Sequence, residues 1–496
     1  MIDELLAGFA LFLQAQNVVV IAAGVLVGLI VGAVPGLSAV MGVALALPFT
    51  FHMEPVTAIL LLVGLYKGGV LGGSISAILI RTPGTPAAAC TTLDGYPMSQ
   101  RGEGGKALMA ALYSSCIADL VSNIALILFA GLLASIALKF GPPEYLWLIA
   151  FSLTIVVAIS SGSLVKGLIA ALCGMLIALI GLDLVYGTER LTFGNFDLMG
   201  GISFVPMLVG LFAIPEVVNF YRQMPAPVRP SGADASRMSA RELRRCAPTI
   251  LRGSLIGVIV GAIPGAGATA AAFLSYGIAR RLSPNGRRFG SGEVEGVCAA
   301  ESGNNGVAGA TLIPLLALGI PGDVVTAVIL GAFLIHDLTP GPLLFAQNID
   351  TVYAVFLGIM LSSVVLFFAG RFVMKAFAGI TRLRGQLLMP AVFVFCLFGS
   401  FAVGNNFFDV GVMLVFGVVG CAMRWLEIPV APFLLGFILA PKFEDNFRRS
   451  LLISDDWTIF FRGPICWIFI ALFVFSLWWG LRREWLDRRL PAGEAA

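Results

Sequence analysis

The chain has 496 residues, of which 58% are apolar and only 12% carry a charge. A soluble domain carries about 25% charged residues, so this composition excludes a soluble enzyme and a disordered chain. Basic residues exceed acidic ones only by 31 to 28, which is not the electrostatic footprint of a nucleic-acid-binding protein. We therefore expect a polytopic membrane protein, and this length holds about 10–13 membrane segments.

Long, continuous apolar runs follow one another along the chain and predict an all-α fold rather than a β-barrel. Before residue 221 they lie near 18–34, 38–51, 55–80, 106–137, 144–160, 163–182 and 200–220. After residue 249 they lie near 250–279, 305–335, 350–370, 387–402, 408–423, 430–440 and 464–481. Runs as short as 38–51 and 430–440 are more typical of half-helices or re-entrant segments than of complete crossings.

The stretch 221–249 separates the two groups of runs and is rich in proline and arginine. The positive-inside rule places it, and the arginines near the C-terminus, in the cytoplasm. The N-terminal tail has no basic residue before the first run, so an odd number of crossings is expected before the linker. We predict a first repeat over 1–220, a cytoplasmic linker over 221–249, a second repeat over 250–485 and a tail over 486–496.

The two halves share an internal repeat. Residues 24–36 (GVLVGLIVGAVPG) and 253–265 (GSLIGVIVGAIPG) are identical at nine of thirteen positions. Each half then carries a second proline-glycine pair inside an apolar run, at Pro83-Gly84 and Pro321-Gly322. An odd number of crossings between the copies makes them inverted repeats, as in many secondary transporters.

Glycines recur every fourth residue just before the first break of each half, at 24, 28 and 32 and at 253, 257 and 261. Such a stripe lets another helix backbone approach closely, so simple helix packing explains the glycines by themselves. Helix packing does not explain the breaks at Pro35-Gly36 and Pro264-Gly265, because freed backbone groups are tolerated in a membrane only where they line a polar cavity. Broken helices at corresponding positions of two halves indicate a transport site.

Polar residues surround the second breaks. Hydroxyls at Ser74, Ser76, Thr82 and Thr85 suit a carboxylate, as do the backbone amides of a half-helix start. In the second half, Asn304 and Asn305 would offer amide donors to a substrate or carbonyl oxygens to an ion, unless they only cap a helix.

Isolated polar residues inside apolar runs are candidates as well. Asp119 and Asn123 share one helix face, for either a functional role or an interhelical hydrogen bond. Lys67 and Arg81 would attract an anion or extend to a lipid headgroup. Asp183 lies near a segment end and is expected at the membrane interface.

No catalytic or nucleotide-binding motif competes with transport. The two histidines, His52 and His336, are far apart, and no zinc-protease, Walker or nucleophile-elbow motif is present. No cofactor and no metal site are expected.

The motif residues resemble the large membrane subunit of tripartite tricarboxylate transporters, the TctA family. The resemblance spans Gly24 to Leu108, including GGSISAILIRTPGTPAAACTTLDGYPMSQRGEGGKAL, and 253–345, including EGVCAAESGNN and TLIPLLALGIPG. It implies a bacterial inner-membrane secondary transporter for carboxylates. A small membrane subunit and a periplasmic solute-binding protein would be its partners, and an Na⁺ or H⁺ gradient would drive uptake. Lys67, Arg81 and Asp323 depart from the family pattern, which leaves the substrate open.

We therefore expect substrate binding between the breaks, with an ion nearby. The substrate residues predicted are Ser74, Ser76, Thr82, Pro83, Gly84, Thr85, Asn304, Asn305, Pro321 and Gly322. The ion-binding residues predicted are Pro35, Gly36, Pro264, Gly265 and Asn304. Alternatives are a tripartite ATP-independent dicarboxylate carrier, a passive channel, and an intramembrane hydrolase using Asp94 and Asp323.

Overall fold

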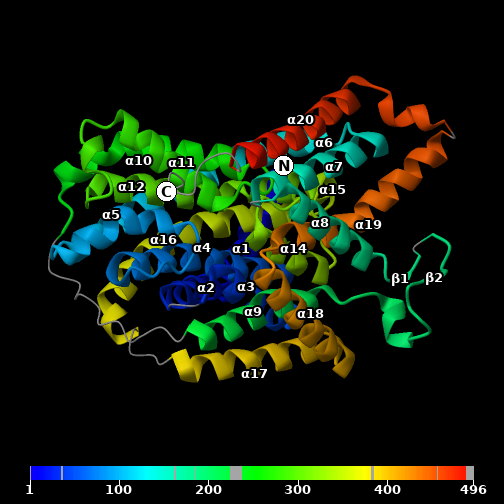
Figure 1. Cartoon of the computed structure of the whole chain (residues 1–496), viewed down its shortest axis with the longest axis horizontal. Coiled ribbons are helices and arrows are strands. Elements are labelled where there is room, and N and C mark those ends of the chain that lie inside the picture. The colour runs from blue at the N-terminus through cyan, green and yellow to red at the C-terminus, as the bar shows by residue number, and fades with distance from the viewer. Residues whose placement is uncertain are drawn as a thin grey trace.

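The computed structural model describes residues 2–34, 37–160, 163–183, 185–223, 237–380, 385–454 and 456–487. Its secondary structure is almost entirely helical (Figure 1). Up to residue 223 the helices are α1 (Ile2–Phe12), α2 (Ala15–Ala33), α3 (Ala39–Ala46), η1 (Leu47–His52), α4 (Pro55–Ile80), α5 (Ala88–Gln100), α6 (Gly104–Ala137), α7 (Pro142–Ser160), α8 (Leu164–Ala178), η2 (Phe196–Gly200) and α9 (Phe204–Gln223).

From residue 240 onward a second series of helices follows. They are α10 (Ala240–Gly261), α11 (Gly267–Leu282), η3 (Gly286–Arg288), α12 (Val294–Ala310), α13 (Leu312–Leu318), α14 (Val324–Ile335), α15 (Pro342–Gln347), α16 (Ile349–Ile380), α17 (Gly385–Gly404), α18 (Phe407–Trp425), α19 (Val430–Ile453), η4 (Trp457–Phe461) and α20 (Pro464–Asp487). A two-stranded hairpin, β1 (Gly181–Leu182) and β2 (Glu189–Arg190), lies between α8 and η2.

Eight helices in the described ranges are long and apolar enough to cross a membrane: α2, α4, α6, α7, α9, α16, α18 and α20. Shorter apolar helices cover Ala39–His52, Leu164–Ala178, Val324–Ile335 and Met389–Gly404. The protein is therefore an all-α, multi-pass membrane protein, as the composition predicts. The run 430–440 differs from expectation, because it is the first part of the 24-residue helix α19, which continues through Pro441 into a polar stretch.

The predicted linker contributes to the second half of the fold. Helix α10 begins at Ala240, inside the stretch 221–249, because Ser239 and Glu242 form a capping box that fixes the helix start. Residues 224–236 of the linker, and the tail from residue 488, lie outside the described ranges. Helices α10 and α11 form a hairpin around the break at Pro264, since Gly253 lies beside Ser275.

Helices α2 and α4 pack in parallel with their backbones in close contact. A Cβ atom on Gly24 or Gly28 of α2 would meet the carbonyl oxygens of Leu61 and Leu65 on α4. In return, a Cβ on Gly68 of α4 would meet the carbonyl oxygen of Val25. The stripe of glycines therefore serves the close helix approach that its spacing predicts.

Helices α10 and α12 repeat this contact in the second half. Gly253 of α10 faces Ser302 of α12, and Gly257 faces Gly303 and Gly306. Gly306 lies against the carbonyl oxygen of Ser254, just as Gly68 lies against that of Val25. In the sequence repeat, each α10 residue lies 229 positions after its counterpart in α2, and each α12 residue lies 238 positions after its counterpart in α4. The contact between α10 and α12 is thus made by the counterparts of residues in the contact between α2 and α4.

The second break of each half has the same backbone geometry. Arg81 and Gly319 end their helices in the left-handed conformation, with φ of 57° and 69°. The next amide then bonds back six residues, Thr82 N to Ser76 O and Ile320 N to Pro314 O, and so closes the end of each helix in the same way. Helices α5 and α14 start after these breaks. The sequence repeat is therefore also a structural one at the breaks.

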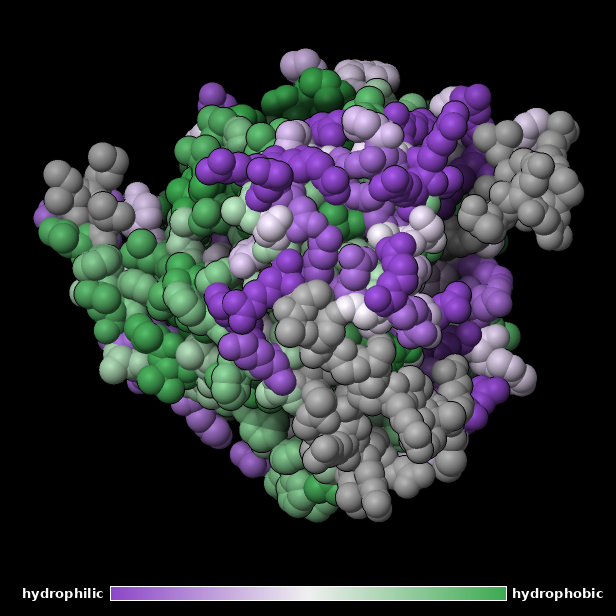
Figure 2. Space-filling model, turned by 90° about the vertical axis from the view of Figure 1, so that its left-hand side faces the viewer, coloured by the Kyte–Doolittle hydropathy of each residue, from purple (hydrophilic) through white to green (hydrophobic). Residues whose placement is uncertain are grey.

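One end of the molecule carries charged contacts, one between the halves and one within the second half. Lys106 at the start of α6 pairs with Glu242 at the start of α10, at 2.5 Å, and Arg245 pairs with Glu293 before α12 at 2.7 Å. This end lies on the left of Figure 1, and Figure 2 shows hydrophilic residues gathered across it. Helix α12 begins at this end, whereas α4 ends there, with Leu79 beside Gly104. Helices α4 and α12 thus run in opposite directions.

The hairpin β1–β2 is held to α19 by ion pairs. Arg448 contacts both carboxylate oxygens of Asp183, at 3.0 and 2.6 Å, and Arg190 contacts Glu444 at 2.8 Å. Asp183 also accepts hydrogen bonds from the amides of Val185 and Tyr186. The Arg448 guanidinium and these amides hold the pKa of Asp183 far below its ordinary value.

Asp183→Asn is expected to loosen this hairpin. Because the folded-state pKa of Asp183 is lowered, its stabilising contribution is complete above the ordinary aspartate pKa of about 4. That contribution is lost as the pH falls toward the folded-state value. Hydrogen exchange over residues 181–190 should therefore accelerate in Asp183→Asn at neutral pH, and in the wild type only in acid. The matched control is the exposed Asp197→Asn; wild-type exchange rates in Asp183→Asn would contradict this role.

Candidate functional site

Two clusters of polar side chains are buried against helix α6. The lysine cluster consists of Lys67, Asp119, Asn123, Ser363 and the carbonyl group of Ile359. The glutamate cluster consists of Glu301, Thr91, Ser115 and Asn305. Because Ser115 and Asp119 are one helical turn apart on α6, the two clusters are neighbours along this helix.

The lysine cluster surrounds one ammonium group with oxygen atoms. Lys67 Nζ lies 3.0 Å from Asp119 Oδ2, 3.1 Å from Asn123 Oδ1 and 3.0 Å from the carbonyl oxygen of Ile359. Ser363 donates to Asp119 Oδ2 at 2.6 Å. Both charged side chains are 1% exposed, so the lysine does not extend to a headgroup. Asp119 and Asn123 make the predicted interhelical hydrogen bonds, across α4, α6 and α16.

The glutamate cluster surrounds a carboxylate with neutral donors. The hydroxyl of Thr91 donates to Glu301 Oε1, and Ser115 Oγ donates to Oε2 at 2.9 Å. Asn305 Nδ2 donates to the same Oε2 at 3.2 Å and to Ser115 Oγ at 2.8 Å. Glu301 is fully buried. Its role was not predicted from the sequence, although it begins the motif that contains both asparagines.

Asn304 differs from its neighbour Asn305. It lies in the middle of α12 and is 1% exposed, yet neither atom of its amide group has a hydrogen-bond partner among the described residues. Ala300, one turn earlier, belongs to an apolar cluster with Ala87 and Cys90 at the start of α5 and Ala272 on α11. Asn304 therefore follows on the face of α12 that is turned toward that helix start. Helix capping is the wrong explanation for both asparagines, because neither is at a helix end.

The first-half break brings several predicted residues together. Gly84 N donates to Gly73 O at 3.2 Å, so the chain folds back along α4, and Thr85 lies against Gly73. Thr85 Oγ1 accepts a hydrogen bond from Ala88 N at 3.3 Å and starts α5. Ser74 is buried; its hydroxyl makes no hydrogen bond among the described residues, and Glu301 is among the groups close to it. Pro83 lies within the same turn, between the left-handed end of α4 and Gly84.

Two predicted hydroxyls are satisfied locally instead. Ser76 Oγ donates to Gly73 O at 3.1 Å within α4, and Thr82 Oγ1 donates to Ile80 O at 3.3 Å. Arg81 is exposed at the same turn, with its guanidinium 5.6 Å from the centre of the Tyr96 ring. Thr82 and Arg81 shape the turn, whereas Ser76 is fully buried within α4.

The second-half break joins both predicted proline-glycine pairs of that half. Gly265 N donates to Gly322 O at 2.7 Å, so Pro264 and Pro321 lie in adjoining turns. Gly322 lies against the backbone of Thr311, which is the counterpart of Gly73. The corresponding Pro35 and Gly36 lie outside the described residues.

The start of α14 already carries a carboxylate of its own. Asp323 Oδ1 accepts a hydrogen bond from Thr326 N at 2.7 Å, and Oδ2 accepts one from the Tyr66 hydroxyl at 2.8 Å. Asp94, the other acid of the hydrolase alternative, is bound by the amides of Gly290 and Gly292 near the charged end. The two aspartates share no partner, so the pairing that an aspartyl hydrolase needs is not formed between them.

The family of the chain follows from its comparison with known proteins. The family model for the tripartite tricarboxylate transporter TctA family matches residues 18–435. The chain belongs to the TctA family. The match extends well beyond the two stretches that carry the resemblance, and it supports this family over the tripartite ATP-independent alternative. A TctA-family protein is a membrane component of a tripartite transport system, with other subunits.

Two proteins of Agrobacterium vitis are similar to this TctA-family chain. An uncharacterized 52.8 kDa protein in the TAR-I ttuC' 3' region is 36% identical over 474 residues, covering 95% of this chain and 94% of that protein. An uncharacterized protein in the TAR-II ttuC' 3' region is 35% identical over 210 residues, covering 42% of this chain and 87% of that protein. No solved structure matches the chain.

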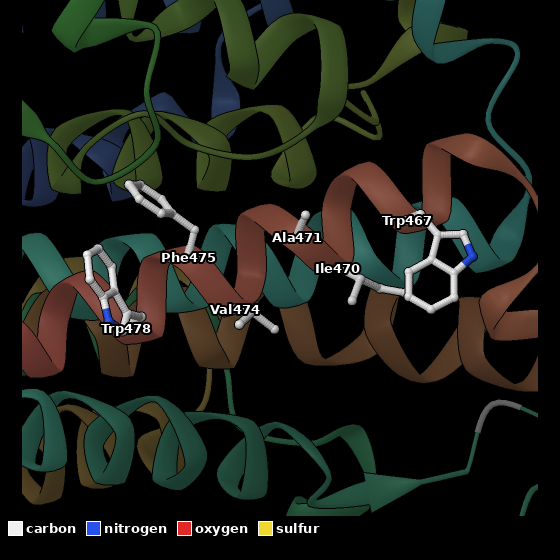
Figure 3. A pocket seen from close by; sticks show the side chains of 6 residues that line it. All are labelled: Trp467, Ile470, Ala471, Val474, Phe475 and Trp478. Atoms are coloured by element: carbon white, nitrogen blue, oxygen red, sulfur yellow. The ribbon is translucent and has the colours of Figure 1, made fainter.

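An apolar groove on α20 has a different character from the polar clusters. It is lined by Trp467, Ile470, Ala471, Val474, Phe475 and Trp478, which all belong to this one helix (Figure 3). No charged or hydrogen-bonding group other than the two indole N–H groups is available there for a carboxylate. The groove therefore has the chemistry of a lipid-facing surface of the TctA-family protein.

Proposed function

We propose that this TctA-family protein is the large membrane subunit of a binding-protein-dependent uptake system for carboxylates, driven by an Na⁺ or H⁺ gradient. A small membrane subunit and a periplasmic solute-binding protein complete the system in the bacterial inner membrane. The central linker and the C-terminus face the cytoplasm. Family membership supports transport, and the arginines of the linker support the orientation by the positive-inside rule.

The buried, unpartnered amide of Asn304 carries the assignment of the substrate site. Buried polar groups are normally hydrogen-bonded, and an orphaned one has a cost of about 1–3 kcal/mol. Beside it, the start of α5 contributes the positive end of a helix dipole, although the amides of Ala88, Ala89 and Cys90 already donate to the preceding turn. A substrate carboxylate placed between Asn304, Ser74 and Thr85 would satisfy these groups together.

The antiparallel arrangement of the two repeat units supports the transport mechanism that we propose. Helices α4 and α12 run in opposite directions, and each is paired in parallel with the glycine-rich helix of its own half, α2 or α10. Two such units related by an axis in the membrane plane can expose one site to either side in turn. We propose that the unit of one half moves against the other as a rigid body.

Asn304→Ala is expected to weaken substrate uptake about tenfold or more, since a hydrogen bond to a charged group contributes ~1.5–3 kcal/mol. The measurement is uptake of candidate carboxylates into proteoliposomes containing both membrane subunits, with the binding protein added. Asn195→Ala is the control, because Asn195 is exposed next to the β-hairpin. Uptake by Asn304→Ala equal to that of the wild type would remove this residue from the site. No uptake of any carboxylate by the wild type, under either gradient, would overturn the proposed function.

A further inference from the structure

Lys67 and Asn305 occupy matched positions in the two halves. They are 238 residues apart, which is also the spacing between the left-handed helix ends at Arg81 and Gly319. The next residues, Gly68 and Gly306, make equivalent contacts with α2 and α10. Both side chains reach groups on α6, where Lys67 contacts Asp119 and Asn305 contacts Ser115.

Each polar cluster places a carboxylate, a hydroxyl and an asparagine amide together, but the two amides are turned differently. Around Lys67 the groups are a carboxylate, an amide oxygen, a backbone carbonyl and, through the carboxylate, a hydroxyl. Around Glu301 the hydroxyls of Thr91 and Ser115 and the Nδ2 group of Asn305 all donate to the carboxylate. The first set surrounds the ammonium group of Lys67, which is a monovalent cation covalently attached to the chain. The second set contains no attached cation.

Glu301 therefore lacks a fixed counter-charge. Among the described residues, no lysine, arginine or histidine forms a salt bridge with it. The titratable groups that face this region are Cys90 and Asp94 on α5 and Tyr276 on α11. The Lys67–Asp119 pair follows one turn along α6 and is neutral as a pair. An isolated buried carboxylate is costly unless a cation or a proton neutralises it.

We propose that the glutamate cluster is the binding site of the exchangeable monovalent cation, Na⁺ or a proton, that drives transport. The fixed ammonium of Lys67 occupies the matched place in the other half, so only one half binds an exchangeable cation. The oxygen atoms of Glu301, Thr91 and Ser115 are the hard ligands that an Na⁺ ion takes, and the same carboxylate can accept a proton. The role of this cation in driving transport rests on the proposed function, whereas its binding to the glutamate cluster does not.

Binding is tested on the purified protein alone, in detergent. The thermal unfolding midpoint is followed while NaCl replaces choline chloride at constant ionic strength. If the cation is Na⁺, the midpoint of the wild type rises with Na⁺ and saturates, and the rise is absent in Glu301→Gln. If the cation is a proton, Na⁺ has no effect, but infrared spectra show a protonated carboxylic acid that titrates with pH and is absent in Glu301→Gln. Glu54→Gln, an exposed glutamate changed in the same way, should behave as the wild type.

Two results would overturn the proposal. In the first, the wild type shows neither a rise of the unfolding midpoint with Na⁺ nor a titrating carboxylic-acid signal. In the second, Glu301→Gln shows the same response as the wild type. Should Glu301→Gln not fold, Thr91→Val and Ser115→Ala keep the carboxylate and remove one hydroxyl each. The midpoint of the Na⁺ or pH titration should then shift at least severalfold, and an unchanged midpoint in both variants would equally overturn it.

The role in coupling is tested in the reconstituted three-component system. Glu301→Gln is expected to exchange substrate across the membrane but not to accumulate it under an ion gradient. Accumulation by Glu301→Gln at the wild-type level would contradict coupling through this cluster. A wild type that neither exchanges nor accumulates any carboxylate would contradict the proposed function instead, without affecting the cation-binding result.

Discussion

Lys67→Met is expected to destabilise the protein by about 3–5 kcal/mol, because it leaves the Asp119 carboxylate buried without its counter-charge. Methionine has nearly the length of lysine, so the loss of charge rather than of volume dominates. Asp119 would keep its bond from Ser363, which does not replace the ammonium. The thermal unfolding midpoint in detergent, measured without Na⁺, should fall by several degrees or more.

A second variant separates the ion pair from the packing of the lysine side chain. Lys67→Met combined with Asp119→Asn removes both charges and should recover most of the lost stability, since a neutral amide is far less costly to bury than a carboxylate. Lys139→Met, at an exposed position, is the control. If Lys67→Met were as stable as the wild type, or the double variant as unstable as Lys67→Met, the ion pair would not be what stabilises the contact between α4 and α6.

Gly28→Leu is expected to prevent α2 and α4 from packing. A Cβ at Gly28 would meet the carbonyl oxygen of Leu65 and, at 2.9 Å, the amide nitrogen of Gly69. Overpacking costs about 1–3 kcal/mol where side chains can move aside, and backbone atoms cannot, so the cost here should exceed that range. The expected result is little folded protein by size-exclusion chromatography in detergent.

The matched control for this change is Gly277→Leu in α11, where a Cβ would meet nothing within 4 Å. It should fold as the wild type or better, because leucine favours a helix over glycine by nearly 1 kcal/mol. Gly257→Leu tests the repeat, since Gly257 lies against Gly303 and Gly306 in the second half. A normal elution profile for Gly28→Leu would contradict the close approach of the two backbones.

The class of fold and the positions of the breaks follow from local sequence features. A run of apolar residues fixes a membrane helix wherever it occurs, and proline-glycine pairs interrupt a helix by removing donors and permitting left-handed backbone. The start of α10 is less apparent, because Ser239 and Glu242 form a capping box within a stretch rich in proline and arginine. The half-helix expected at 430–440 is wrong because polar residues extend α19 beyond the apolar run.

The polar clusters depend on contacts that no local pattern contains. Lys67 bonds to the carbonyl of Ile359, which is 292 positions away, and Glu301 bonds to Thr91, which is 210 positions away. Asn304 and Asn305 are adjacent in sequence but face different helices, since successive residues of a helix are 100° apart. The signal that was available is the 238-residue spacing, which places Lys67 opposite Asn305 and Asp323 opposite Thr85.

Helix α6 contributes to both polar clusters, with Ser115 in one and Asp119 in the other. A helix is nearly rigid along its axis, so a shift or rotation that releases Ser115 from Glu301 also displaces Asp119 from Lys67. Helix α6 therefore connects the two clusters through one continuous backbone. A movement of α6 as a rigid body would therefore change both clusters together.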